Sequence, residues 1–246
     1  MKMLLKHFLR TFNLKLSRIQ TPGSHLRPIG DLLSTLEDVK ARGLKCRVVL
    51  DIGASDGSWS RYAKTVFKDA KYVLMEPRPI CHPALDRFAR EFPDTMIIKA
   101  GAASKAGTLT LTDWDTASTF LGVEDATAEK HSLPTVTVNS LFPDSELPDL
   151  VKLDVEGFEL EVLEGASRLF RMTELFIIEV ALDPFSSPRP TAPDVINFMR
   201  ERDYHLYDIA GFIRRPYDGA LALLDLCFAR GGGLLRAESH KWHAEP

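Results

Sequence analysis

Several features that mark specialised proteins are scarce in this sequence of 246 residues. There are only three cysteines, Cys46, Cys81 and Cys227, and they lack the spacing of metal ligands, which favours a reducing compartment. Lysine and arginine number 31 and acidic residues 34, so the chain lacks the basic excess of nucleic-acid-binding domains. We therefore expect a cytoplasmic protein that does not act on nucleic acid.

Long hydrophobic runs are also absent. The apolar runs within residues 1–20 are too short for a transmembrane helix, and no small-residue cleavage site follows them, so we expect neither a span nor a secretory signal. Basic residues are interspersed with these apolar ones, which is typical of a basic amphipathic helix. Residues 1–20 could make peripheral contact with an anionic membrane, or pack on the domain or on a second subunit of a homo-oligomer.

The overall composition is that of one globular enzyme, with 45% hydrophobic and 26% charged residues. We predict a helical extension over residues 1–43, a main α/β domain over 44–231 and a frayed tail over 232–246. The sequence contains no internal repeat.

The most informative motif is an apolar run, residues 48–52, followed by a glycine-containing turn. Asp51 lies at the carboxyl end of this predicted strand, and Gly53 and Gly57 allow the backbone to turn sharply and approach a ligand. Glu76 follows the next strand about 20 residues later, where nucleotide-binding α/β folds place a carboxylate that accepts from ribose hydroxyls. This motif predicts a nucleoside-cofactor site formed by Asp51, Gly53, Ala54, Ser55, Gly57, Glu76 and Pro77.

The turn differs from the dinucleotide fingerprint, because Gly53 and Gly57 are four residues apart and Asp56 lies between them. An acidic side chain there repels a pyrophosphate. S-adenosylmethionine carries a positive charge on sulfur and an ammonium group, so it fits this turn better. A nicotinamide-dependent oxidoreductase uses the same architecture and is kept as an alternative.

A second motif begins with the predicted strand 149–153 and continues through Asp154, Glu156 and Gly157 into a helix. Phe158, Val162 and Leu163 mark the apolar face of that helix, and Glu159, Glu161 and Glu164 are expected on its other sides. Two carboxylates, Asp154 and Glu156, therefore share one turn between a strand and a helix.

Taken together, the two motifs resemble the FkbM-type S-adenosylmethionine-dependent methyltransferases, over about residues 46–182. The resemblance implies a Rossmann-like class I methyltransferase fold, in which helices cover both faces of a seven-stranded, mostly parallel sheet and the last strand is antiparallel. It also implies that residues 44–231 form the methyltransferase domain, that Ala102 and Ala103 flank the adenine, and that the methyl group goes to a hydroxyl of a sugar, glycolipid or polyketide-like molecule.

The remaining pattern agrees with alternating strands and helices. Strands are predicted at 46–52, 72–76, 95–100, 149–153 and 175–180, helices at 29–42, 58–67, 82–92, 158–170 and 194–202, and a closing antiparallel pair at 204–209 and 222–230. Residues 107–112 and 135–141 alternate as half-exposed strands do, whereas 113–133 are polar and irregular and are expected to form a loop that covers the site.

The carboxyl ends of the strands converge on one crevice, which brings together Asp51, Glu76, Asp154 and Glu179. We predict Asp154 or Glu156 as the group that takes the hydroxyl proton, with Asp154 also at the cofactor site. His131 in the expected loop is a weaker candidate for the base, and Trp114 and Phe120 are candidates for the pocket wall. Oxygens of Asp154, Glu156 and Glu179 could bind Mg²⁺, but no spacing requires it and we predict no metal.

A third interpretation is a cofactor-binding protein that has the fold but has lost catalysis. Two departures from the family pattern permit it: Ser55 in the first turn and Phe142 before the second motif. Retained cofactor binding without transfer to any acceptor would favour it.

Overall fold

The computed structural model describes residues 27–114, 117–119, 129–184 and 189–241. The predictions for residues 1–20 and for Phe120 lie outside these ranges. For Trp114, the structure describes the backbone but not the side chain. No helix among the described residues has the length and apolar content needed to cross a membrane.

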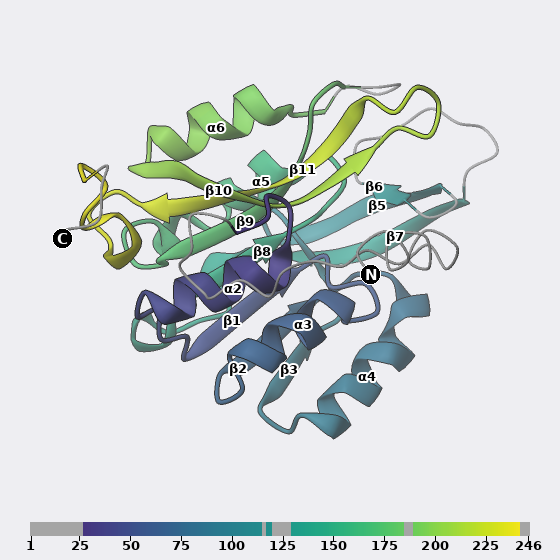
Figure 1. Cartoon of the computed structure of the whole chain (residues 1–246). Coiled ribbons are helices and arrows are strands. Elements are labelled where there is room, and N and C mark those ends of the chain that lie inside the picture. Colours follow the sequence, from purple (N-terminus) through teal and green to yellow (C-terminus); the bar gives the residue numbers. More distant parts are fainter. Residues whose placement is uncertain (1–26, 115–116, 120–128, 185–188, 242–246) are drawn as a thin grey trace, which may run out of the picture.

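The main sheet has seven strands in the order β10-β11-β9-β8-β1-β2-β3 (Figure 1). Its strands are β1 Val48–Ile52, β2 Lys71–Met75, β3 Thr95–Ile98, β8 Leu150–Leu153, β9 Leu175–Ala181, β10 Tyr204–Arg214 and β11 Leu221–Arg230. Strand β11 is antiparallel to both neighbours, whereas the pairs from β3 through β1 to β9 are parallel. The predicted seven-stranded sheet with a reversed last strand is confirmed.

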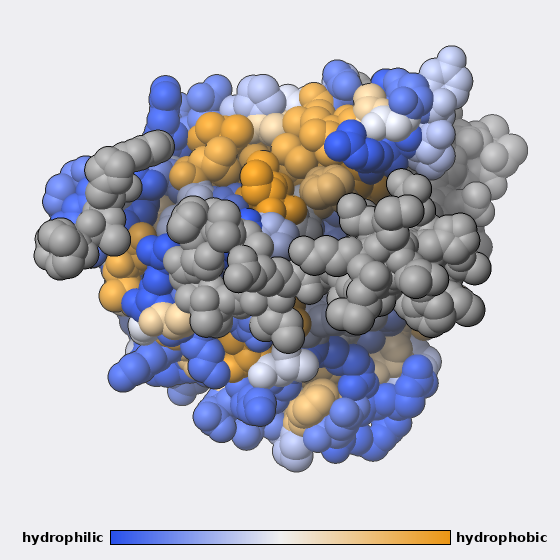
Figure 2. Space-filling model, in the orientation of Figure 1, coloured by the Kyte–Doolittle hydropathy of each residue, from blue (hydrophilic) through white to orange (hydrophobic). Residues whose placement is uncertain are grey.

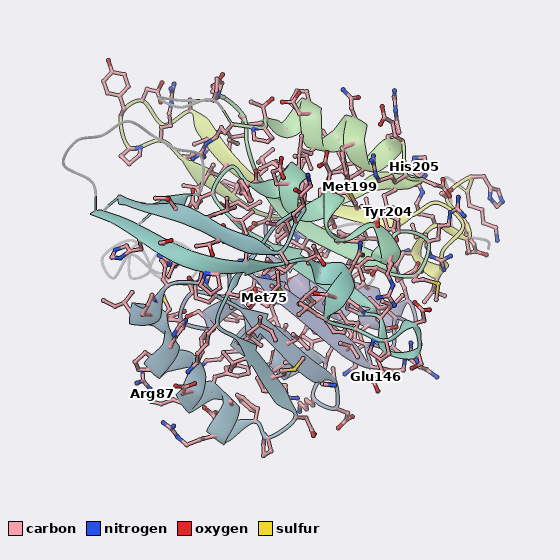
Figure 3. All side chains as sticks on the ribbon, turned by 180° about the vertical axis from the view of Figure 1, so that it is seen from behind. Met75, Arg87, Glu146, Met199, Tyr204 and His205 are labelled. Atoms are coloured by element: carbon pink, nitrogen blue, oxygen red, sulfur yellow. The ribbon has the colours of Figure 1, made fainter. Side chains whose placement is uncertain are left out.

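Helices cover both faces of this sheet (Figure 1). They are α2 Leu32–Ala41, α3 Ser58–Val66, α4 His82–Glu91, α5 Glu159–Glu164 and α6 Ala192–Arg200. Buried residues of α2, α3 and α4 share one apolar cluster, and those of α5 and α6 share the other. Met199 of α6 and Tyr204 of β10 belong to the second cluster and lie close together in Figure 3.

Side chains of β1 alternate between the two faces, as the two-residue period of a strand requires. Leu50 and Ile52 belong to the cluster under α5 and α6, whereas Val49 belongs to the cluster under α2 and α3. Asp51 therefore points to the α3 side of the sheet, a direction that matters for its role.

A second sheet corrects the prediction of a long loop over residues 113–133. Its strands are β4 Gly101–Ala102, β5 Gly107–Trp114, β6 Ala117–Thr119 and β7 Glu129–Val136, in the order β4-β7-β5-β6. Strand β7 is mostly polar and pairs with β5 in antiparallel register, for example Leu111 opposite His131. A polar strand lacks the apolar alternation on which the prediction relied, so its pairing could not be read from the sequence.

Three further expectations were wrong. Residues 138–140 form a short 3₁₀ helix, not the end of a strand, and α5 ends at Glu164 before a separate 3₁₀ turn at 167–169. The tail is not frayed over its first residues, because Leu235 is buried and its backbone N–H donates to Oε1 of Glu174 at 2.9 Å.

Candidate active site

A cavity of about 220 Å³ opens at the carboxyl ends of β1, β2 and β8. Its wall combines the ends of these strands with β4, and Met75 of β2, labelled in Figure 3, forms part of it. The lining residues are Ile52, Gly53, Ser55, Met75, Glu76, Pro77, Arg78, Ala100, Gly101, Ala102, Asp154, Val155 and Glu156. The structure thus brings together residues from both sequence motifs.

Gly53 allows the first turn to lie directly against the second. Its φ is 77°, and a Cβ at this position would lie 1.7 Å from the backbone oxygen of Asp154. No side chain fits there, which explains the glycine. Gly57 has a different role, because it caps α3 with a φ of 83° and packs near Leu85 and Phe88, away from the cavity wall.

Glu76 is a buried carboxylate, only 2% exposed, at the floor of the cavity. Its Oε2 accepts from the Ser55 N–H at 2.9 Å, and its Oε1 accepts from the Arg78 N–H at 2.9 Å and from Arg78 Nε at 3.0 Å. A carboxylate offers about four acceptor positions, so about one is left for a ligand hydroxyl. This arrangement suits the predicted role of Glu76 at a ribose.

Asp51 does not line the cavity, although the sequence predicted a direct cofactor contact. It is 0% exposed, and its Oδ2 accepts from Ser60 Oγ of α3 at 2.6 Å. Burial raises the pKa of this carboxyl, while Lys152 and the Ser60 hydrogen bond act in the opposite direction. Successive side chains of a strand point to opposite faces of the sheet, so Asp51 points toward α3. It therefore lies behind the cavity wall, where it supports the turn through its hydrogen bond with Ser60.

Of the two alanines predicted to flank the adenine, only one lines the cavity. Ala102 lines the cavity, whereas Ala103 is buried outside the wall and its carbonyl oxygen abuts Gly165, where a Cβ would lie 2.1 Å away. Ala54 is also buried and is not part of the wall. Ser55 and Pro77, by contrast, are lining residues as predicted.

A cluster of carboxyl groups lies on the other side of the cavity. Oxygens of Asp154, Glu156 and Glu179 lie within 4.8 Å of one another. Burial, followed by the charge of Asp154, raises the pKa of Glu156, and the same causes raise the pKa of Glu179 to about 9. These carboxyl groups therefore cannot all be ionised at neutral pH.

Sequence reasoning missed several charged residues around this cluster. Lys152 donates from Nζ to Asp154 Oδ2 at 2.8 Å, and Nη2 of Arg189 lies 3.9 Å from Glu156 Oε2. Burial and then the Asp154 charge act to raise the pKa of Asp225 on β11, with Lys152 opposing. Of these residues, only Lys152 could have been recognised from the sequence, because a lysine within an apolar central strand is unusual.

One expectation for α5 was also wrong. Glu159 was placed on an exposed side of the helix, but it is buried and accepts from the Gly157 N–H at 2.7 Å. Burial raises its pKa to about 7. The helix has only six residues, which is too short for its periodicity to fix which side faces the core.

The candidate histidine is not among the residues that line the cavity. His131 belongs to β7 and not to a loop. Asp154 and Glu156 are the predicted catalytic residues that the structure places at the cavity wall.

The charge of the cavity distinguishes between cofactor classes. Three carboxylates line it, from Glu76, Asp154 and Glu156, against one basic residue, Arg78. Such a wall favours a ligand that carries positive charge and disfavours a pyrophosphate. The residues present therefore fit S-adenosylmethionine.

The sheet order, the reversed last strand and the cavity at the strand ends define a class I methyltransferase fold. Residues 51–206 match the methyltransferase FkbM domain, which is more than half of the chain, so this protein belongs to the FkbM methyltransferase family. The cofactor of that family is S-adenosylmethionine.

Two curated relatives are similar to this chain. The methyltransferase sdnD of Sordaria araneosa is 30% identical over 48% of this chain and 59% of its own length. The hexuronic acid methyltransferase AglP of Haloferax volcanii is 27% identical over 56% of this chain and 58% of its own length. The chain therefore spans somewhat over half the length of these relatives.

Among solved structures, the FkbM methyltransferase of Methylobacillus flagellatus KT aligns with a TM-score of 0.49 and 17% identity. The alignment covers 74% of this chain and 44% of that one.

Proposed function

We propose that the protein is an S-adenosylmethionine-dependent O-methyltransferase that acts on a hydroxyl of a sugar, glycolipid or polyketide-like small molecule. The observation that carries this proposal is the position of Asp154. It lies at the wall of the cofactor cavity and within the carboxyl cluster, so one carboxylate faces the place where a methyl donor and an acceptor would meet.

The cofactor would be held mainly by the first turn and the end of β2. Gly53 and Ser55 would contact the methionine part, Glu76 the ribose and Ala102 the adenine. When bound, S-adenosylmethionine supplies a methyl group on a positively charged sulfur, which keeps the electron pair of the broken bond. Glu76, Asp154 and Glu156 offer compensating negative charge.

Asp154 is the better base of the two predicted carboxylates. Burial and the charge of the neighbouring Asp154 raise the pKa of Glu156, which favours its protonated form. Asp154, by contrast, forms an ion pair with Lys152, whose Nζ lies 2.8 Å from Oδ2. Asp154 would accept the proton that the hydroxyl loses as its oxygen bonds to the methyl carbon, and would later release that proton to water. Glu156 would orient the acceptor.

The acidic cluster also bears on the acceptor. The relative AglP is named for action on a hexuronic acid, a sugar that has both hydroxyl and carboxyl groups. An ionised carboxylate would be repelled by Asp154 and Glu156 at the cavity wall, whereas a neutral hydroxyl can donate to them. The site therefore favours a hydroxyl as the methyl acceptor.

The test is an acceptor screen with the purified protein. Sugars, glycolipids and polyketide-like alcohols are incubated with S-adenosylmethionine, S-adenosylhomocysteine formation is followed, and the position of the methyl group is assigned by NMR. A methyl ether on a hydroxyl carbon supports the proposal, and the matched deoxy compound serves as the control. A methyl ester or N-methyl product would contradict it.

The two alternatives have separate readouts. A nicotinamide oxidoreductase would bind NADH, which the acidic cavity disfavours. A protein that has lost catalysis would bind S-adenosylhomocysteine but transfer no methyl group to any acceptor. Peripheral membrane contact through residues 1–20, cytoplasmic localisation and a homo-oligomer stay predictions from the sequence.

A further inference from the structure

Lys152 is the charged residue whose place in the fold is hardest to explain by packing. It lies within β8, whose four residues are all buried, between β1 and β9 in the sheet. The residue is 6% exposed, so its ammonium group has little contact with water. A buried charge of this kind is costly unless it is paired, and it therefore needs a compensating function or partners.

Its partners come from both sequence motifs. Nζ of Lys152 lies 2.8 Å from Asp154 Oδ2, 3.4 Å from the Gly53 oxygen and 3.9 Å from Asp51 Oδ1. That Asp51 oxygen has no hydrogen-bond partner among the described residues. One ammonium group thus links the turn after β1, on the cofactor side, to the turn after β8, on the acceptor side.

The second observation concerns the pair Asp154 and Glu179. Oxygens of the two carboxyl groups lie within 4.8 Å of each other and of Glu156, so mutual repulsion favours a state in which one member of the pair holds a proton. Charges around the pair are distributed unevenly. Lys152 contacts Asp154, whereas Glu179 faces the carboxyls of Glu156 and Asp225.

The remaining charged neighbours do not change this asymmetry. They are Asp51 beside Lys152, Glu159 on α5 near Asp154, and Arg189 and Arg78 near Glu156. Among the described residues, the cation that forms an ion pair with a member of this pair is Lys152, and its partner is Asp154.

We propose that Lys152 is a positioning residue that keeps Asp154 ionised and oriented toward the acceptor hydroxyl, so that the proton shared with Glu179 resides on Glu179. This rests on the proposed role of Asp154 as the base. Without the ammonium group, Asp154 and Glu179 would compete for the proton, and the base would be protonated in part of the molecules.

The directions of the pKa shifts agree with the geometry. Burial and then the Asp154 charge raise the pKa of Glu179 to about 9, which leaves it protonated at neutral pH. Burial acts to lower the pKa of Lys152, but Asp51 and Asp154 outweigh it and the net shift is upward. Lys152 is therefore a permanent cation.

The first test uses the variant Lys152→Met and the matched control Lys99→Met, which removes an exposed lysine paired with Asp86. For Lys152→Met, we expect the acidic limb of the kcat/KM profile to move up by about one pH unit or more, with kcat reduced more than the cofactor affinity. Lys99→Met should reproduce the wild-type profile. An unmoved limb in folded Lys152→Met would overturn the proposal.

The second test needs neither cofactor nor acceptor. NMR titration of ¹³C-labelled side-chain carboxyls in the unliganded protein should show that proton loss from the cluster of Asp154, Glu156 and Glu179 moves to higher pH in Lys152→Met than in the wild type, because the cation beside the cluster is gone. This readout is independent of methyl transfer. The titration can therefore support the role of Lys152 when the acceptor screen fails, and the acceptor screen can succeed when the titration contradicts that role. An unchanged titration of this cluster in folded Lys152→Met would overturn the proposal.

If Lys152→Met fails to fold, the variant Asp154→Asn tests the pair through the pKa of Glu179. Removing the Asp154 charge should bring the pKa of Glu179 down by about one unit or more toward its ordinary value. A Glu179 pKa that stays near 9 in Asp154→Asn would show that burial alone holds the proton, and would contradict the role given to the pair.

Discussion

The two sides of the cavity hold their carboxylates in opposite ways. On the cofactor side, Glu76 accepts at Oε2 from Ser55 and at Oε1 from Arg78. On the acceptor side, Asp154, Glu156 and Glu179 face one another, with Lys152 as the cation nearest to Asp154. The donors of the first side hold a carboxylate in a fixed orientation, whereas on the second side the carboxyl groups influence the protonation of one another.

The two sides also differ in the interactions that control their carboxyl groups. Glu76 accepts from backbone N–H groups of the turns around it, so these turns fix the orientation of its carboxylate. The acceptor-side carboxyl groups depend on one another for their ionisation state. Substitutions on the two sides should therefore separate binding from turnover.

The largest effect is expected for Asp154→Asn. An amide cannot take the hydroxyl proton, so kcat should fall about 10²-fold or more while the affinity for S-adenosylhomocysteine stays near that of the wild type. Steady-state kinetics and calorimetry measure the two quantities. The control is Asp144→Asn, at an exposed aspartate paired with Arg168. Normal turnover in Asp154→Asn would remove Asp154 as the base.

Glu76→Ala should affect binding and not the chemical step. Loss of hydrogen bonds to a charged group, worth about 1.5–3 kcal/mol, should weaken S-adenosylhomocysteine binding by about 10-fold to 100-fold. At saturating cofactor, kcat should change much less. The control is Glu91→Ala, which removes an exposed carboxylate paired with Arg61. Unchanged affinity would separate Glu76 from the ribose site.

Glu179→Gln should alter the pH dependence of stability. The pKa of Glu179 is raised from 4.5 to about 9 in the folded state, so the protonated carboxyl favours folding fully below pH 4.5. That contribution declines as the pH rises from there toward 9 and is lost above it. Glutamine does not titrate, so the variant should lose less stability than the wild type between these pH values.

Thermal unfolding at a series of pH values checks this expectation for Glu179. The matched control is Glu146→Gln, at an exposed glutamate paired with Lys71. Parallel melting curves for the wild type and Glu179→Gln across this pH range would show that Glu179 is not protonated in the folded protein.

The smallest effect is expected from removal of divalent metal. The ammonium group of Lys152 already lies 2.8 Å from Asp154 and supplies a positive charge there. Methyl transfer should therefore continue at the same rate in the presence of EDTA. A loss of activity that Mg²⁺ restores would show that the carboxyl cluster uses a metal.

Much of the cofactor side could be predicted from the sequence. Gly53, Ser55 and Glu76 lie in short segments with strong local signals, a glycine turn and an acid after a strand, and the structure places all three at the cavity. The direction of Asp51 was missed because its strand is buried on both faces, which hides the alternation that would assign it to the α3 side.

The acceptor side was less predictable because it depends on long-range packing. Asp154 and Glu156 follow one strand and were recognised, but the closeness of Glu179 and Asp225 depends on how β9 and β11 pair with the rest of the sheet. Lys152 stood within the second motif and was read only as part of its pattern. Its contact with Asp51 requires the register of β1 against β8.

The most direct test of this account is calorimetric titration of the wild type, Glu76→Ala and Asp154→Asn with S-adenosylhomocysteine, with NADH as the control ligand. We predict micromolar binding to the wild type and to Asp154→Asn, clearly weaker binding to Glu76→Ala, and no binding of NADH. Absence of binding to the folded wild type, or binding of NADH alone, would contradict the assignment of the cavity to S-adenosylmethionine.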